Sequence, residues 1–218
     1  MDRLQVLIAG GGIGGLAAAL ACARAGARPQ VLERASAFAE VGAGIQMGPN
    51  VTKLLHAWDL RAALARVVAF PAGLHIRSAR TGQTLGALRL GELATARYGA
   101  PYATVHRADL HGVLLEAVQA QGVALRLNAE VQGLSQDAAG VQLQLEDGTQ
   151  LHGEVLVGAD GLWRRVRQAV LGDGPPIATG HLAYRALTRQ DDLPVALRAQ
   201  DITVWLGPKL HVVQYPVC

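Results

Sequence analysis

A glycine-rich segment near the N-terminus restricts the fold of this chain more than any other feature. Residues Gly10 to Gly15 read Gly-Gly-Gly-Ile-Gly-Gly and match the pattern G-x-G-x-x-G. The segment follows an apolar run at 4–9 that suits a buried strand, and it opens an alanine-rich helical stretch at 13–24. A second strand is predicted over 28–33. This order predicts the β-turn-α-β unit of a doubly wound α/β fold that binds a dinucleotide.

Each position of the glycine motif has a predicted physical role. Gly10 makes the tight turn, Gly12 lets the backbone approach a pyrophosphate, and Gly15 lets the helix and the strand pack closely. The helix N-terminus at Ile13 and Gly14 offers free N–H groups and a partial positive charge to the phosphates. These features predict a phosphate-binding loop.

Glu33 ends the second predicted strand and is the candidate ribose-binding acid. It follows Gly15 by 18 residues, close to the spacing of about 20 that this role requires. Its carboxylate can accept hydrogen bonds from both ribose hydroxyls and would repel a 2′-phosphate, which argues against NADP in this site. The alternative is a glycine-rich turn followed by a surface glutamate.

Composition excludes several other classes of protein. With 218 residues the chain forms one or two domains, and two cysteines cannot build a disulfide framework. Only 4% of residues are aromatic and the net charge is +3, which argues against a nucleic-acid binder. Residues 4–23 carry no charge and could span a bilayer, but the glycines inside them disfavour a helix there. We therefore expect a cytoplasmic protein that binds neither nucleic acid, membrane nor metal.

The rest of the chain alternates between predicted helices and strands. A hairpin turns at Asp147-Gly148, and Gly174-Pro175-Pro176 marks a boundary. Helices are predicted over 51–66, 109–121 and 162–171, and strands over 74–78, 84–88, 141–145, 154–157, 181–185, 201–205 and 210–215.

Three further segments carry candidate ligand-binding groups. The loop at 41–50 holds three glycines and suits close approach to a flat ring or a phosphate; otherwise it is a loop in which Asn50 caps a helix. Arg107 could reach a phosphate or a ribityl oxygen, or pair with Asp109 in solvent. Asp160 follows a predicted strand, where it could bind a sugar hydroxyl or simply make an Asp-Gly turn.

Together these motifs resemble the class A flavoprotein aromatic hydroxylases, which are FAD-dependent monooxygenases. The resemblance is greatest to the branch with salicylate hydroxylase, 3-hydroxybenzoate 6-hydroxylase and 6-hydroxynicotinate 3-monooxygenase. Its basis is the order of three segments: the glycine motif with Glu33, the loop at 42–50, and Gly158-Ala159-Asp160-Gly161 with Arg167. It runs from about residue 4 to residue 217.

The resemblance implies an α/β fold with two parts. A Rossmann-like FAD-binding domain would comprise 1–72 and 101–178, and an incomplete β-sheet substrate domain would comprise 73–100 and 179–218. NADH or NADPH would reduce FAD, and O₂ would form a flavin C4a-hydroperoxide that hydroxylates a phenolic or hydroxylated heteroaromatic acid. A homodimer is compatible with this assignment.

The resemblance also implies roles for individual residues. Glu33 and Arg34 would flank the FAD ribose, Gly44 and Ile45 would lie near the cofactor, Arg107 would contact FAD, and Val131 would lie beside the adenine. Asp160 belongs to a fingerprint that touches both FAD and the pyridine nucleotide.

His211 and Tyr215 are the candidate catalytic residues. They are four residues apart, so both face the same side of a regular strand. A histidine can take a phenolic proton near neutral pH, and a tyrosine hydroxyl can hydrogen-bond a substrate oxygen. The pair resembles the one with which hydroxybenzoate and hydroxynicotinate hydroxylases activate substrate. Alternatively, both are amphipathic residues on a half-buried sheet.

Two departures from the family pattern bear on activity. Arg164 stands where the Asp-Gly fingerprint has a helix-capping serine. The family's third fingerprint, a Gly-Asp pair in its C-terminal half that binds the ribityl chain, has no counterpart in this sequence. Two hypotheses follow: a flavin hydroxylase presented as a truncated sequence, or a catalytically incompetent fragment with a dinucleotide-binding fold. A third, an NAD-dependent dehydrogenase, is disfavoured by the loop at 42–50 and by the His211/Tyr215 pair.

Overall fold

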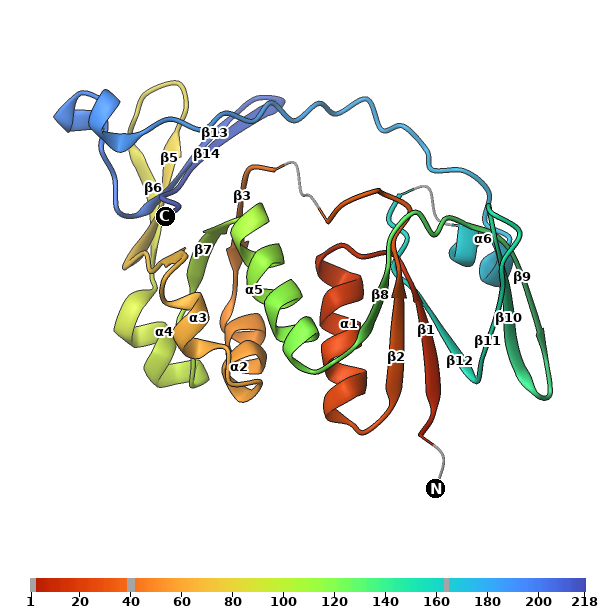
Figure 1. Ribbon diagram of the computed structural model, residues 1–218. Coiled ribbons are helices and arrows are strands. Elements are labelled where there is room, and N and C mark those ends of the chain that lie inside the picture. The colour runs from red at the N-terminus through yellow and green to blue at the C-terminus, as the bar shows by residue number, and fades with distance from the viewer. Residues whose placement is uncertain (1–2, 39–41, 163–164) are drawn as a thin grey trace. The chain divides into compact units, whose positions relative to one another are not determined.

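The computed structural model describes residues 3–38, 42–162 and 165–218, and the chain divides into two compact units (Figure 1). Unit 1 comprises Met1–Glu40 and His111–Leu182, and unit 2 comprises Val41–Leu110 and Ala183–Cys218. The predicted FAD-binding and substrate domains are defined by what they bind, whereas these units are defined by compactness. The predicted domain division therefore stays a prediction.

Unit 1 is built on a parallel sheet in the order β12-β1-β2-β8. Its strands are β1 (Gln5–Ala9), β2 (Arg28–Leu32), β8 (Ala124–Arg126) and β12 (Val155–Gly158). The connection from β1 to β2 is helix α1 (Ile13–Arg24), which has the predicted bounds. Residues 6–9 of β1 are buried, as an apolar strand in a covered parallel sheet should be.

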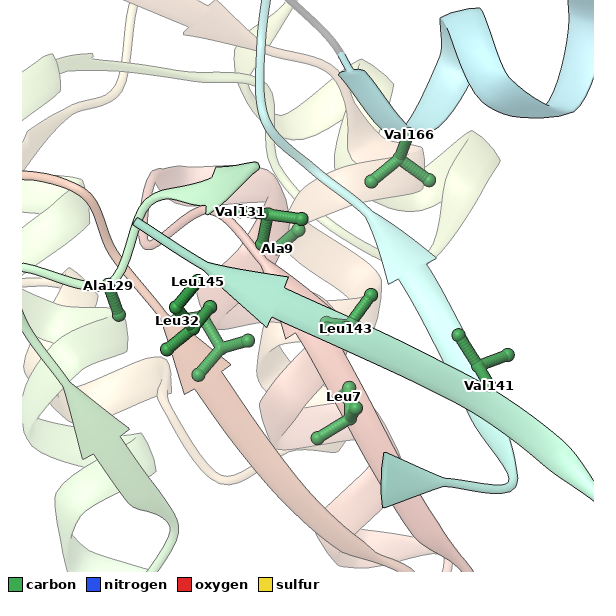
Figure 2. Packing of buried hydrophobic residues seen from close by; sticks show 9 residues of the cluster. All are labelled: Leu7, Ala9, Leu32, Ala129, Val131, Val141, Leu143, Leu145 and Val166. Carbon is green, nitrogen blue, oxygen red and sulfur yellow. The ribbon is translucent and has the colours of Figure 1, made fainter. Parts of the chain in front are cut away.

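An antiparallel sheet in the order β11-β10-β9 packs over the parallel strands of unit 1. Its strands are β9 (Val131–Asp137), β10 (Gly140–Leu145) and β11 (Gln150–Gly153). The predicted hairpin joins β10 to β11, and Gly148 supplies the left-handed turn residue with φ +83°. Helix α6 (Arg165–Leu171) adds Val166 to the shared core. Figure 2 shows this core, formed by Leu7, Ala9, Leu32, Ala129, Val131, Val141, Leu143, Leu145 and Val166.

Unit 2 contains two further sheets. One has the order β14-β13-β5-β6 and is made of β5 (Gly73–Ser78), β6 (Thr84–Arg89), β13 (Ile202–Gly207) and β14 (Leu210–Gln214). The other has the order β3-β7-β4 and is made of β3 (Gly44–Met47), β4 (Val68–Ala69) and β7 (Ala103–His106).

The helices of unit 2 lie between these strands in the sequence. They are α2 (Pro49–Ala57), α3 (Arg61–Leu64), α4 (Gly91–Tyr98) and the short 3₁₀ turns η1 (Gln190–Asp192) and η2 (Val195–Leu197). Helix α5 (Arg107–Ala120) begins in unit 2 and continues into unit 1. In the described ranges, no helix combines the length and the hydrophobicity that crossing a membrane demands.

Two predicted elements differ from the structure. The single helix predicted over 51–66 is two helices, because Asp59 adopts a left-handed φ of 65° that ends the first. Residues 181–185 do not form the predicted strand. Leu182 is 80% exposed and Tyr184 is 92% exposed there, so the segment lacks the packed neighbour that stabilises a strand.

Candidate functional site

The glycine loop of unit 1 has the close backbone approaches that its sequence predicts. Gly10 directly follows β1 with φ +110°, and a Cβ there would lie 2.3 Å from the Ala159 carbonyl oxygen. A Cβ at Gly15 would lie 1.8 Å from the Gly10 carbonyl oxygen. Glycine is required at position 10 by the backbone conformation and at position 15 by the lack of room for a side chain.

The opposite side of this loop is open. Gly12 is the N-cap of α1 in extended conformation, and a Cβ built on Gly14 would meet no atom of the described residues within 4 Å. The first turn of α1, which includes Ile13, has no acidic residue. N–H groups at this end have no partners within the helix, and the helix dipole favours an anion. The loop therefore fits the pyrophosphate of a dinucleotide.

The Glu33 carboxylate lies directly beside the loop. One oxygen accepts a hydrogen bond from the Gly11 N–H at 2.6 Å, and the other accepts one from the Ala35 N–H at 2.8 Å. A carboxylate offers about four acceptor positions, so capacity for ribose hydroxyls remains. Arg34, next in the chain, is exposed to solvent. Glu33 therefore both fixes the loop and stays available to a sugar.

Asp160 lies next to the same loop at the end of β12. The Ala159 N–H donates to the Ala9 carbonyl at 2.8 Å, which holds this segment against the end of β1. The Asp160 carboxylate accepts the Val166 N–H at 3.0 Å and so caps the start of α6. The family's serine at position 164 would offer an oxygen that accepts a helix N–H, which arginine does not. The Asp160 carboxylate provides such an acceptor. Arg164 itself lies outside the described residues.

Val131 is buried in the core of unit 1. It is the first residue of β9, and the Ala129 N–H two residues earlier donates to the Glu33 carbonyl at 2.9 Å. The start of β9 is therefore held next to Glu33, the residue that follows β2.

The remaining predicted cofactor residues lie in unit 2. The Arg107 N–H donates to the Ala43 carbonyl at 3.2 Å, and a Cβ at Gly42 would lie 2.8 Å from the Arg107 Cβ. Gly44 is buried and Ile45 is half-buried, both in β3, which pairs with β7. This backbone packing places Arg107, the first residue of α5, beside β3, which carries Gly44 and Ile45.

Tyr215 packs directly on Gly44. Its hydroxyl donates a short hydrogen bond to the Gly44 carbonyl, and a Cβ at Gly44 would lie 2.5 Å from the Tyr215 ring. Burial raises the pKa of Tyr215, although the positive charge of Arg185 acts in the opposite direction. The phenol therefore stays protonated and able to donate at neutral pH.

His211 is an exposed residue of β14, opposite Leu206 of β13. Tyr215 follows the end of β14 and is half-buried, so the two predicted catalytic side chains have different surroundings. The C-terminal segment also runs along the sheet of β3, β7 and β4. The Thr104 hydroxyl donates to the Pro216 carbonyl at 2.6 Å, and the Cys218 thiol donates to the Val68 carbonyl at 3.1 Å.

Two residues that the sequence did not indicate, Phe38 and His111, contact Gly11 of the glycine loop. A Cβ at Gly11 would lie 2.5 Å from the Phe38 ring, and the buried His111 ring places Nε2 2.8 Å from the Gly11 carbonyl oxygen. The run of three glycines was a signal for Gly11. Phe38 and His111 had none, because their contact depends on how α5 packs in unit 1.

An α/β unit with this glycine loop, and with a carboxylate directly after the second strand, is typical of a dinucleotide-binding protein. Residues 3–180 match the model of the FAD binding domain family, and the chain belongs to that family. The predicted α/β fold class and the resemblance to flavoprotein hydroxylases are confirmed.

Similar relatives carry the names of aromatic hydroxylases. The chain is 43% identical to 3-hydroxybenzoate 6-hydroxylase 1 of Aquipseudomonas alcaligenes, over 98% of this chain and 54% of the relative. It is 39% identical to a 3-amino-4-hydroxybenzoate 2-monooxygenase of Streptomyces platensis, over 99% of this chain and 54% of the relative. The chain thus spans about half the length of the curated relatives it matches.

A solved structure shares the fold. HpxO of Klebsiella pneumoniae, crystallised with FAD and uric acid, superposes with a TM-score of 0.79 at 24% identity. The match covers 98% of this chain and 53% of HpxO.

Proposed function

We propose that this chain binds FAD and serves in the hydroxylation of a phenolic or hydroxylated heteroaromatic acid, with NADH or NADPH and O₂ as co-substrates. The observation that carries the proposal is the glycine loop, which is open at Gly14 and bordered by the Glu33 carboxylate. Membership of the FAD binding domain family supports FAD as the dinucleotide.

The proposed FAD contacts divide by chemical group. The loop and the first turn of α1 hold the pyrophosphate, Glu33 and Arg34 flank the ribose, and Val131 borders the adenine. Asp160 and Arg107 bind polar oxygens, and Gly44 with Ile45 provides backbone close to the ring. The loop residues concerned are Gly10, Gly12, Ile13, Gly14 and Gly15.

FAD supplies the redox chemistry when bound, accepting a hydride from the pyridine nucleotide and activating O₂. Overall, the pyridine nucleotide is oxidised, one oxygen atom is inserted into a ring C–H bond to give a hydroxyl group, and the other is reduced to water with uptake of a proton. His211 takes the phenolic proton and so makes the ring electron-rich, and Tyr215 donates a hydrogen bond to the substrate oxygen. For that role the Tyr215 hydroxyl must exchange its present acceptor, the Gly44 carbonyl, for the substrate.

The relatives support the substrate class. Those described above act, by name, on a hydroxybenzoate and on an aminohydroxybenzoate, both of them phenolic acids. We therefore propose a small phenolic acid as the substrate. A homodimer and a cytoplasmic location stay predictions.

A second candidate function is FAD binding without hydroxylation. The surroundings of the two predicted catalytic residues favour it. The Tyr215 hydroxyl is already engaged by the Gly44 carbonyl, and His211 is exposed rather than enclosed. Activation of a phenol needs a base and a hydrogen-bond donor held in place for the substrate. His211 and Tyr215 do not meet this requirement in the present arrangement.

One preparation of the 218-residue chain tests both candidates. FAD binding is measured by quenching of flavin fluorescence, and NADH oxidation is followed with and without 3-hydroxybenzoate, with the product identified by chromatography. Bound FAD with substrate-stimulated NADH loss and a hydroxylated product supports the enzyme. Bound FAD without product supports the second candidate. A chain that does not bind FAD contradicts both.

The His211→Ala variant tests the proposed base. Because His211 is exposed, we expect the thermal midpoint and the FAD affinity to match those of the wild type. We expect the rate of hydroxylation to fall by about 10²–10⁴, the usual contribution of a general base. An unchanged rate would remove His211 from the mechanism. The exposed histidine His181, substituted in the same way, is the matched control.

A further inference from the structure

A buried imidazole contacts the glycine loop of unit 1. His111, in α5, is 5% exposed, and its Nε2 is 2.8 Å from the Gly11 carbonyl oxygen. A carbonyl oxygen only accepts hydrogen bonds, so Nε2 carries the hydrogen and donates it. The Phe38 ring packs beside the imidazole, with the two centroids 6.2 Å apart and a tilt of 39°.

Gly11 is held from both of its polar groups. The Glu33 carboxylate accepts the Gly11 N–H at 2.6 Å, while His111 donates to the Gly11 carbonyl. Steric contacts add to this restraint, because a Cβ at Gly11 would lie 2.5 Å from Phe38 and 3.0 Å from Glu33. Gly11 therefore has one orientation, which side chains from outside the loop determine.

The orientation of Gly11 determines the direction of the next N–H. A trans peptide is planar, so the Gly11 carbonyl and the Gly12 N–H point in opposite directions. With the carbonyl held by His111, the Gly12 N–H points away from the imidazole. Gly12 is the N-cap of α1, where N–H groups have no partners within the helix.

We propose that His111 is a positioning residue for the dinucleotide phosphates. It turns the Gly11–Gly12 peptide so that the Gly12 N–H joins the donors at the start of α1. This inference rests on the proposed FAD binding, and it adds a residue that acts through the loop rather than by touching the cofactor. Loss of the imidazole leaves a buried carbonyl unpaired and frees the peptide to rotate.

The test compares three variants of the full chain by their FAD dissociation constants and by the thermal midpoints of the apoproteins. His111→Leu removes the donor, and His111→Gln restores an N–H donor on a flexible side chain. Val118→Ala creates a cavity at a fully buried position of the same helix and is the structural control. We expect His111→Leu to weaken FAD binding about tenfold, the effect of one lost hydrogen bond. His111→Gln should recover most of this loss, and Val118→Ala should keep the wild-type affinity at a lowered midpoint.

The amide resonance of Gly12 gives a second measurement in ¹⁵N-labelled protein. Addition of ADP, which carries the pyrophosphate without the flavin, should shift it in the wild type and in His111→Gln but not in His111→Leu. Wild-type affinity and a Gly12 shift in His111→Leu would overturn the proposal, as would equal weakening by Val118→Ala. If His111→Leu does not fold, a tenfold loss in His111→Gln without a Gly12 shift would overturn it. A wild type that binds neither FAD nor ADP would contradict the proposed function itself.

Discussion

Gly14 and Gly15 are neighbours in the sequence with opposite surroundings. Among the residues that the structure describes, no atom lies within 4 Å of a Cβ at Gly14, whereas a Cβ at Gly15 lies 1.8 Å from the Gly10 carbonyl oxygen. We expect Gly14→Ala to raise the free energy of unfolding by up to about 1 kcal/mol, because alanine is the better helix former. The same methyl group should weaken FAD binding, since it fills the open side of the loop.

Gly15→Ala is the contrasting variant, and it should destabilise the chain by about 1–3 kcal/mol through overpacking. Urea unfolding and FAD titration of both variants separate the two effects. If Gly14→Ala binds FAD as tightly as the wild type, the phosphates do not lie against Gly14.

The sequence predicted single residues well where a backbone constraint leaves a mark in the residue type. Gly10 and Gly15 could be assigned because only glycine fits their conformation and space, and the spacing to Glu33 follows from the length of one helix and one strand. His111 left no such mark. A histidine on a helix has many uses, and its hydrogen bond to Gly11 joins residues 100 positions apart.

Among the elements, α6 depends on a cap that comes from outside the helix. The Asp160 carboxylate accepts the Val166 N–H at 3.0 Å. We expect Asp160→Ala to lower the free energy of unfolding by about 1 kcal/mol, whereas Asp160→Asn should lose much less because asparagine also caps helices. Urea denaturation measures both. Equal losses in the two variants would show that the charge of Asp160, rather than its acceptor, stabilises this region.

Strands β5 and β13 are joined at one end by Asp201. Its carboxylate accepts the N–H groups of Ala72 at 3.0 Å and Gly73 at 2.9 Å, and it lies 3.1 Å from His75 Nε2. Partial burial raises the pKa of Asp201, but the hydrogen bonds from His75, Gly73 and Ala72 outweigh it, so the pKa lies below its ordinary value. A carboxyl group whose pKa is lowered by folding stabilises the protein above its unfolded pKa, and this stability is lost as the pH falls through the folded value.

Asp201→Asn should therefore lower the thermal midpoint at pH 7, and the difference from the wild type should shrink below about pH 4. Thermal unfolding from pH 7 to pH 3 measures this. Asp191→Asn is the control, because Asp191 is 80% exposed and 3.9 Å from Arg189, and exposed pairs contribute little. If the difference in thermal midpoint between the wild type and Asp201→Asn stays constant down to pH 3, the ionised Asp201 carboxylate is not the source of the added stability.

Predicted elements were most accurate where a local signal ends them. Helix α1 has its predicted bounds because glycines precede and follow it. The prediction of a single helix over 51–66 was wrong because the apolar periodicity continues past Asp59. The left-handed conformation of Asp59, which ends the first helix, has no strong signal in the sequence. The strand at 181–185 was wrong because strand propensity is realised only beside a paired and packed neighbour.

At the scale of the whole molecule, the two units should respond differently to FAD. Unit 1 holds the glycine loop, Glu33 and Asp160, and its core lies directly behind them. At FAD concentrations about 100-fold above the dissociation constant, the ligand can add about 2.7 kcal/mol of stability. We expect hydrogen exchange to slow most at amides 10–16 and 33–35. Slowing confined to 73–89 and 201–215 would place the ligand in unit 2 instead.

Local sequence features are enough to define a dinucleotide-binding unit in this chain. A glycine loop, the strand before it, the helix after it and a carboxylate 18 residues on are local features, and short-range sterics and hydrogen bonding are enough to specify them. Which side chains hold that loop, and which are already engaged in other contacts, becomes clear from the fold. Glu33 and His111 hydrogen-bond to Gly11, Asp160 caps α6, and Tyr215 packs on Gly44. These contacts join residues brought together by packing, and packing depends on the whole buried core rather than on any local stretch of sequence.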